Sequence, residues 1–132
     1  MKIAVDTNVL VRAVVQDDPR QADIASKTLK AEMVAVAPSC LCEFVWVLRR
    51  VYGFKAPSIA AAIRELLAAG NVETNRPVVD AGLAMLDVGG DFADGVIAYE
   101  GRWLGGETFV SFDAKAVEML KAQGVAARLM QK

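Results

Sequence analysis

The sequence predicts an α/β domain with a mostly parallel central sheet covered by helices on both faces. Short runs of β-forming apolar residues alternate with helix-length segments along the whole chain. Strands that are separated by helices pair in parallel through right-handed crossovers. The 132 residues suffice for one domain, 1–132, and they contain no repeat, linker or low-complexity segment.

The expected strands are short and the expected helices have recognisable ends. Strands are predicted at 2–5, 33–37, 72–74 (the weakest), 107–112 and 125–129. Helices are predicted at 9–15, 19–31, 39–52, 56–71, 77–90, 91–106 and 113–124. Proline is tolerated in the first turn of a helix, and Pro19 and Pro57 lie near two of these starts. Glycines such as Gly53 and Gly70 end helices.

The composition excludes several kinds of active site. The chain has no histidine, which rules out a Ser-His-Asp triad, a Cys-His pair and a His-ligated zinc or iron site. A net charge of −1 argues against coating nucleic acid through bulk charge, but it allows a local basic rim. Any enzymatic chemistry would depend on carboxylates, lysines, hydroxyls or a metal ion.

Nothing in the sequence indicates a membrane or secretion. No uninterrupted apolar stretch reaches about 18 residues, and the start MKIAVDT lacks the features of a signal peptide. We therefore expect a cytoplasmic protein in which Cys40 and Cys42 are small, reduced core residues.

Four acids fall where a parallel sheet brings side chains to one edge. Asp6 ends the first strand, Asp113 ends FVSF, Asp94 lies in the first turn of DFADG, and Glu43 lies within SCLCEFVWVL. Each also has a structural interpretation. Asp6, Asp113 and the nearby Asp91 can cap helices. Glu43, with mostly apolar helix neighbours, can be a neutral or salt-bridged core acid.

Together the four carboxylates predict a site for a hard divalent cation. Neighbouring carboxylates repel one another, so they raise one another's pKa or recruit cations. Oxygen ligands without His or Cys favour Mg²⁺ or Mn²⁺. Such ions activate water and stabilise the charge that develops in phosphodiester hydrolysis, which then needs no histidine base.

Four segments together resemble the PIN-domain family, more narrowly the VapC-type toxin ribonucleases of bacterial toxin–antitoxin pairs. They are AVDTNVLV, SCLCEFVWVL, GGDFADGVIAYEGRWLGG and FVSFDAKAVEML, and the resemblance covers essentially the whole chain. It implies a PIN-like three-layer α/β/α sandwich and a Mg²⁺- or Mn²⁺-dependent endoribonuclease. It also implies a homodimer that is inhibited by a cognate antitoxin protein.

The resemblance implies specific roles for individual residues of this chain. The catalytic, metal-binding quartet would be Asp6, Glu43, Asp94 and Asp113. Asn8 and Ser111 stand where the family often has polar residues that support the acids. Ser111 replaces the more common Thr, and Gly95 replaces the more common Ala, both of which are small changes.

Cations must hold an RNA substrate beside these acids. Arg12 lies four residues after Asn8 and Lys115 two residues after Asp113, so both are candidate RNA contacts. Arg49 and Arg50 form the one adjacent basic pair, without an assigned role. For each of them the alternative is an ordinary solvated surface charge.

The helix 39–52 is more apolar than one core face requires. Phe44, Trp46 and the nearby Phe54 contribute to this excess. The helix can therefore pack against a second subunit or an antitoxin, with burial in the core as the equal alternative.

Other α/β families fit less well. Phosphatases of the haloacid dehalogenase type need a second aspartate where this chain has Asn8, and receiver domains need an acid pair where Asp6 stands alone. The remaining alternative is a catalytically idle PIN-fold module that uses the acidic edge to bind a partner's arginines. Such a module would need no divalent ion.

Overall fold

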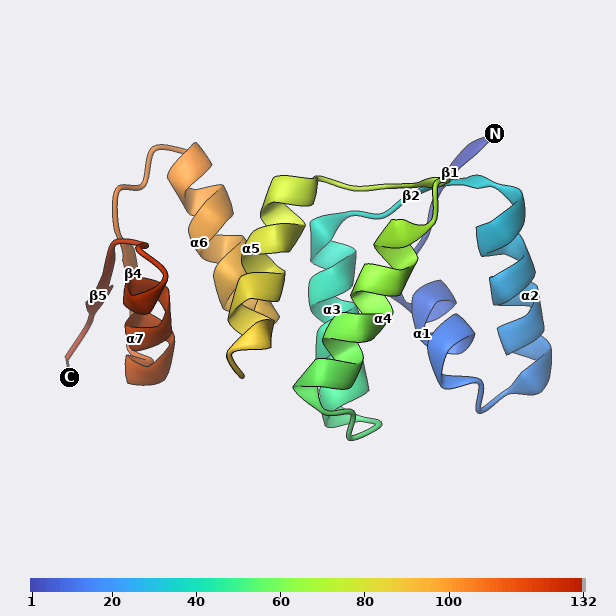
Figure 1. Cartoon of the computed structure of the whole chain (residues 1–132), viewed down its shortest axis with the longest axis horizontal. Coiled ribbons are helices and arrows are strands. Elements are labelled where there is room, and N and C mark those ends of the chain that lie inside the picture. The colour runs from blue at the N-terminus through green and yellow to red at the C-terminus, as the bar shows by residue number, and fades with distance from the viewer. Residues whose placement is uncertain (132) are drawn as a thin grey trace. The chain divides into compact units, whose positions relative to one another are not determined.

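The structure is a computed structural model that describes residues 1–131 and divides into two compact units, Met1–Asn75 and a second unit that begins at Arg76. Each unit contains a parallel sheet and helices (Figure 1). The predicted α/β class with parallel strands is therefore confirmed.

The first unit has three strands and four helices. In chain order they are β1 (Lys2–Ala4), α1 (Thr7–Val15), α2 (Pro19–Ala31), β2 (Met33–Ala35), α3 (Pro38–Arg50), α4 (Ala56–Ala68) and β3 (Val72–Glu73). The strands pair in parallel in the order β1-β2-β3. Ile3 lies opposite Val34, which lies opposite Val72. Both segments that lead from one strand to the next are helical, as crossovers between parallel strands commonly are.

Helix α3 lies in the core of the first unit, where it packs against α1 and, side by side, against α4 (Figure 1). Phe44 and Leu48 of α3 are almost completely buried, and so are Ile59 and Ile63 of α4. These residues recur at helical spacing, so each helix turns one apolar face inward. Val34 in the middle strand is fully buried as well.

The second unit has three helices and two strands. They are α5 (Arg76–Asp87), α6 (Phe92–Trp103), β4 (Phe109–Ser111), α7 (Ala114–Ala122) and β5 (Ala127–Leu129). The strands β4 and β5 pair in parallel, with Val110 opposite Arg128. Helices α5 and α6 pack against each other along their length, and Phe92 between them is fully buried.

Every predicted helix and strand is present, with ends that differ by a few residues. Helix α1 begins at Thr7, two residues earlier than predicted, because the side chain of Asp6 caps it. Among residues 1–131, no helix is both long enough and apolar enough to cross a membrane.

Candidate metal centre

Asp6 follows strand β1 and caps helix α1. Its Oδ1 accepts hydrogen bonds from the backbone N–H groups of Asn8 (3.0 Å) and Val9 (3.4 Å). The side chain is exposed, and both bonds use the same oxygen. Capping and metal binding are therefore compatible for Asp6. Asn8 supports this acid through its backbone N–H group, which the sequence alone did not indicate.

Glu43 is exposed on α3, so the interpretation of it as a buried core acid is wrong. The helix turns a different face to the core, formed by residues such as Leu41, Phe44 and Val45. Glu43 instead faces the start of α1, where the hydroxyl of Thr7 lies 3.4 Å from its Oε2. Thr7 has no predicted role, because its partner is 36 residues away along the chain.

Asp6 and Glu43 act on the same buried thiol. Burial raises the pKa of Cys40, and the charges of Glu43 and Asp6 raise it further, while a hydrogen bond from Thr7 opposes the shift. The Cys40 Sγ lies 3.7 Å from the carbonyl oxygen of Val5, to which it can donate. Cys40 is therefore a buried, neutral thiol at neutral pH, whereas Cys42, also predicted in the core, is only partly buried. Asp6 and Glu43 form what we call the first acid group.

Asp94 belongs to a second acid group, with Asp91 and Asp113. Asp91 caps α6 by accepting a hydrogen bond from the N–H group of Ala93 (3.0 Å), as predicted. Asp94 follows in the first turn, where the helix dipole favours negative charge. Its pKa is nevertheless raised, first by burial and then by the charges of Asp91 and Asp113. The protein thus stabilises the ionised form of Asp94 less well than water does.

Asp113 follows strand β4 and caps α7. Its Oδ1 accepts a hydrogen bond from the N–H group of Ala116 (3.2 Å). Its own N–H group donates to the hydroxyl of Ser111 (2.9 Å). Ser111 therefore orients the backbone that carries this acid.

The four candidate acids lie within a stretch of the chain that matches a known protein family. Residues 3–119 match the PIN domain, a stretch that includes all four candidate acids and parts of both units. The chain belongs to the PIN domain family. PIN domain proteins are metal-dependent nucleases that act on nucleic acid. A search of curated proteins found no match to this chain.

The donor chemistry of this PIN domain fits a hard divalent cation. Both acid groups offer carboxylate oxygens, and the chain has no histidine to favour zinc or iron. Within residues 1–131, however, no three potential ligands are grouped so that they could hold an ion. The individual ligands of the PIN domain metal therefore stay a prediction.

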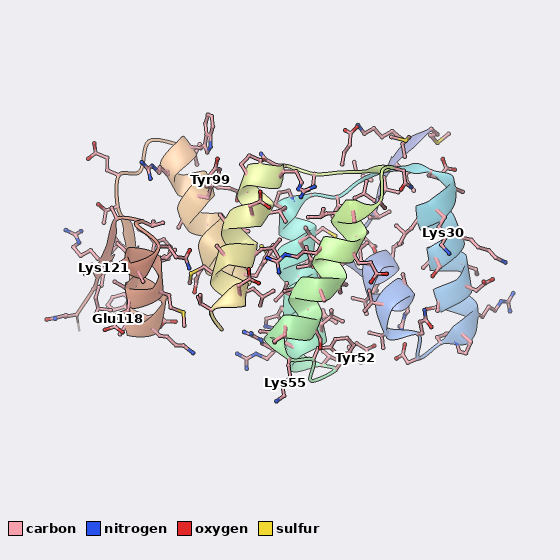
Figure 2. The ribbon with its side chains drawn as sticks, viewed as in Figure 1. Lys30, Tyr52, Lys55, Tyr99, Glu118 and Lys121 are labelled. Carbon is pink, nitrogen blue, oxygen red and sulfur yellow. The ribbon has the colours of Figure 1, made fainter. Side chains whose placement is uncertain are left out.

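The predicted RNA contacts differ in how they are held. Arg12 forms an ion pair with Asp17 (3.0 Å), and Tyr52, labelled in Figure 2, donates a hydrogen bond to the other oxygen of Asp17 (3.2 Å). Lys115 is exposed on α7. Arg49 and Arg50 lie in the last turn of α3, where positive charge is favoured by the helix dipole.

Proposed function

We propose that this PIN domain protein is a divalent-metal-dependent endoribonuclease, the toxin of a VapBC-type toxin–antitoxin pair. Asp6, Glu43, Asp94 and Asp113 bind Mg²⁺ or Mn²⁺ and are the catalytic acids. The whole chain, 1–132, acts as one nuclease domain. The family match supports this last point, because it runs without interruption from the first unit into the second.

The placement of the acids is the observation that carries the proposal. Asp6 and Asp113 each cap the helix that follows a parallel strand, and Asp94 lies in the first turn of α6. In the second group the pKa of Asp94 is raised, first by burial and then by the charges of Asp91 and Asp113. Charge that is costly to the free protein is what a bound cation would stabilise.

The residues have distinct tasks in the proposed reaction. The carboxylates of the quartet hold and orient the cation, and the capping bonds keep Asp6 and Asp113 in place before it binds. The cation, when bound, supplies an activated water and stabilises the charge on the phosphodiester. The backbone N–H group of Asn8 supports Asp6, and the hydroxyl of Ser111 supports Asp113 by accepting from its N–H group. Arg12 and Lys115 contact the phosphates of the RNA.

The family resemblance also supports the proposed partners. The substrate is RNA, the regulator is a cognate antitoxin protein, and the active species is a homodimer in the cytoplasm. Trp46 on α3, with 60% of its surface exposed, is the side chain that we assign to the dimer contact. Phe44 on the same helix is buried in the core, so only part of the excess apolar surface is free for a partner.

Cleavage of total bacterial RNA by the purified, antitoxin-free protein tests the proposal. The reaction is run with MnCl₂ or MgCl₂, with EDTA, and with the Asp94→Asn variant, and the new RNA ends are mapped. Asp80→Asn is a matched control, because Asp80 is an exposed acid on α5 outside both acid groups. We expect discrete cleavage that EDTA and Asp94→Asn abolish and that Asp80→Asn retains.

Calorimetry with Mn²⁺ separates the possible failures. If the protein binds Mn²⁺ but leaves total RNA intact, its specificity is narrow and the RNA that it cuts is absent from the sample. A protein that neither cuts RNA nor binds Mn²⁺ would contradict the nuclease and favour the idle binding module.

A further inference from the structure

The hydroxyl of Thr7 links the first acid group to the core. Thr7 is the first residue of α1 and directly follows Asp6. Its Oγ1 lies 3.4 Å from Oε2 of Glu43 and 3.8 Å from Sγ of Cys40. Cys40 and Glu43 are three residues apart on α3, so they lie on neighbouring turns of the same helix. One side chain at the start of α1 thus contacts two residues of α3.

The hydroxyl of Thr7 forms its stronger hydrogen bond with the carboxylate of Glu43. A threonine hydroxyl can donate one hydrogen bond and accept others. Sulfur is a weak acceptor, whereas a hydrogen bond to a carboxylate is charge-assisted and about twice as strong as a neutral one. The thiol proton of Cys40 has its own acceptor in the carbonyl oxygen of Val5. The Thr7 hydroxyl is within hydrogen-bond range of both Glu43 and Cys40, and the carboxylate of Glu43 is the stronger acceptor of its proton.

We propose that Thr7 is a positioning residue, whose hydroxyl holds the carboxylate of Glu43 beside Asp6 so that both can bind one divalent cation. This inference rests on the proposed metal-dependent activity. It adds a residue that does not itself bind the metal or the substrate.

Glu43 needs such a contact more than Asp6 does. Asp6 is fixed by two bonds to the backbone of α1. Glu43 is exposed and has a longer side chain with more rotamers, which cation binding must order. A contact that restricts the side chain beforehand reduces the entropy lost on binding. Removal of the Thr7 hydroxyl should therefore weaken metal binding and leave the chemistry of the loaded protein nearly unchanged.

Thr7→Val and Thr7→Ser, in the whole chain, test the inference. Valine keeps the shape of threonine without the hydroxyl, whereas serine keeps the hydroxyl. Affinity for Mn²⁺ is measured by calorimetry without RNA, and cleavage of RNA is measured over a range of Mn²⁺ concentrations. Thr28→Val is the matched control, because the hydroxyl of Thr28 donates to the carbonyl of Ile24 on its own helix (2.9 Å).

We expect Thr7→Val to weaken Mn²⁺ binding about tenfold, the lower end of the loss typical when a residue that orients a metal ligand is changed. The Mn²⁺ concentration for half-maximal cleavage should rise in parallel, while the maximal rate at saturating Mn²⁺ is retained. Thr7→Ser should restore the affinity, and Thr28→Val should leave it unaltered. If Thr7→Val does not fold in a thermal unfolding test, Thr7→Ala replaces it, since alanine adds no apolar bulk beside Glu43.

Two results would overturn the inference, and they differ. If Thr7→Val binds Mn²⁺ as tightly as the unaltered protein while Glu43→Gln binds it weakly, the metal site stands and Thr7 does not position it. If the unaltered protein itself binds no Mn²⁺, the proposed function fails and the role of Thr7 fails with it.

Discussion

Gly95 of α6 lies directly against the carbonyl oxygen of Ala81 in α5. A Cβ atom at position 95 would stand 2.3 Å from that oxygen, which is part of the backbone and cannot rotate away. Gly82 on α5 is similarly close to the ring of Phe92. The two helices can approach this closely because both contact points lack a side chain, and the approach fixes the turn of α6 that carries Asp94.

Gly95→Ala should therefore destabilise the protein, although alanine is the better helix former. The new methyl group must push α6 away from α5, which costs about 1–3 kcal/mol as overpacking. The displacement also moves Asp94, so we expect weaker Mn²⁺ binding as well. Urea unfolding and Mn²⁺ calorimetry measure the two effects.

Gly101→Ala, on the same helix, is the control for this variant. A Cβ at position 101 would meet no atom within 4 Å. Replacement of a helical glycine by alanine should then stabilise the protein by about 0.5–1 kcal/mol. Equal effects of the two variants on stability would show that the contact of Gly95 with Ala81 does not matter.

The order of helices and strands was predictable from the sequence because each depends on local signals. Apolar periodicity, Pro19 and Pro57 at helix starts, and the capping aspartates act within a few residues of their position. The start of α1 lies two residues before its predicted position, because the Asp6 cap starts the helix at the next residue and apolar periodicity alone does not indicate that cap.

The parts of the site that sequence analysis missed depend on distant contacts. Gly95 looked like a minor departure from alanine, because its constraint comes from Ala81 in another helix. The apolar neighbours of Glu43 along α3 allow burial in the core as an alternative to metal binding, but the helix turns another face to the core. Thr7 carried no signal of its own, since its contact with Glu43 exists only after α1 and α3 pack.

Asp94→Asn should stabilise the metal-free protein at neutral pH while it abolishes activity. The pKa of Asp94 is raised in the folded state by burial and by Asp91 and Asp113. Between the unfolded and folded pKa values the folded state binds more protons, so stability falls as pH rises through that window. Removal of the charge should restore roughly 0.5 kcal/mol at pH 7, the scale of a partly solvated charge interaction.

Thermal unfolding of both proteins at pH 3 and pH 7, with EDTA present, tests this sign. The difference should vanish at pH 3, where Asp94 is protonated in both states. Asp80→Asn, at an exposed acid on α5, is the control for the substitution itself. A variant that is less stable than the unaltered protein at pH 7 would contradict the argument.

Arg12→Glu should weaken RNA binding and reduce its salt dependence. If Arg12 contacts a phosphate, its loss should lower the slope of log affinity against log salt by about 1. Stability should change by no more than about 1 kcal/mol, because the Arg12–Asp17 pair is partly exposed. Binding is measured in a salt titration with Asp94→Asn as the background, so that the RNA is not cut.

Arg20→Glu is the control for this charge reversal. Arg20 is exposed on α2, and its reversal changes the net charge by the same amount. An identical fall in affinity for both variants would mean that Arg12 acts only through net charge. In that case Asp17, rather than RNA, would be the functional partner of Arg12.

Trp46→Lys should convert the proposed homodimer into a monomer. Trp46 is 60% exposed on α3, and a large exposed aromatic residue is typical of the centre of an interface. A lysine there would have to lose its hydration in the contact, so we expect the dimer to weaken by about 30-fold or more. Ile24→Lys is the matched control, because Ile24 is 57% exposed on α2 and the substitution likewise exchanges an exposed apolar side chain for lysine.

Sedimentation of the unaltered protein as a monomer at micromolar concentration would contradict the dimer. A Trp46→Lys variant that remains dimeric would instead place the interface away from this face of α3.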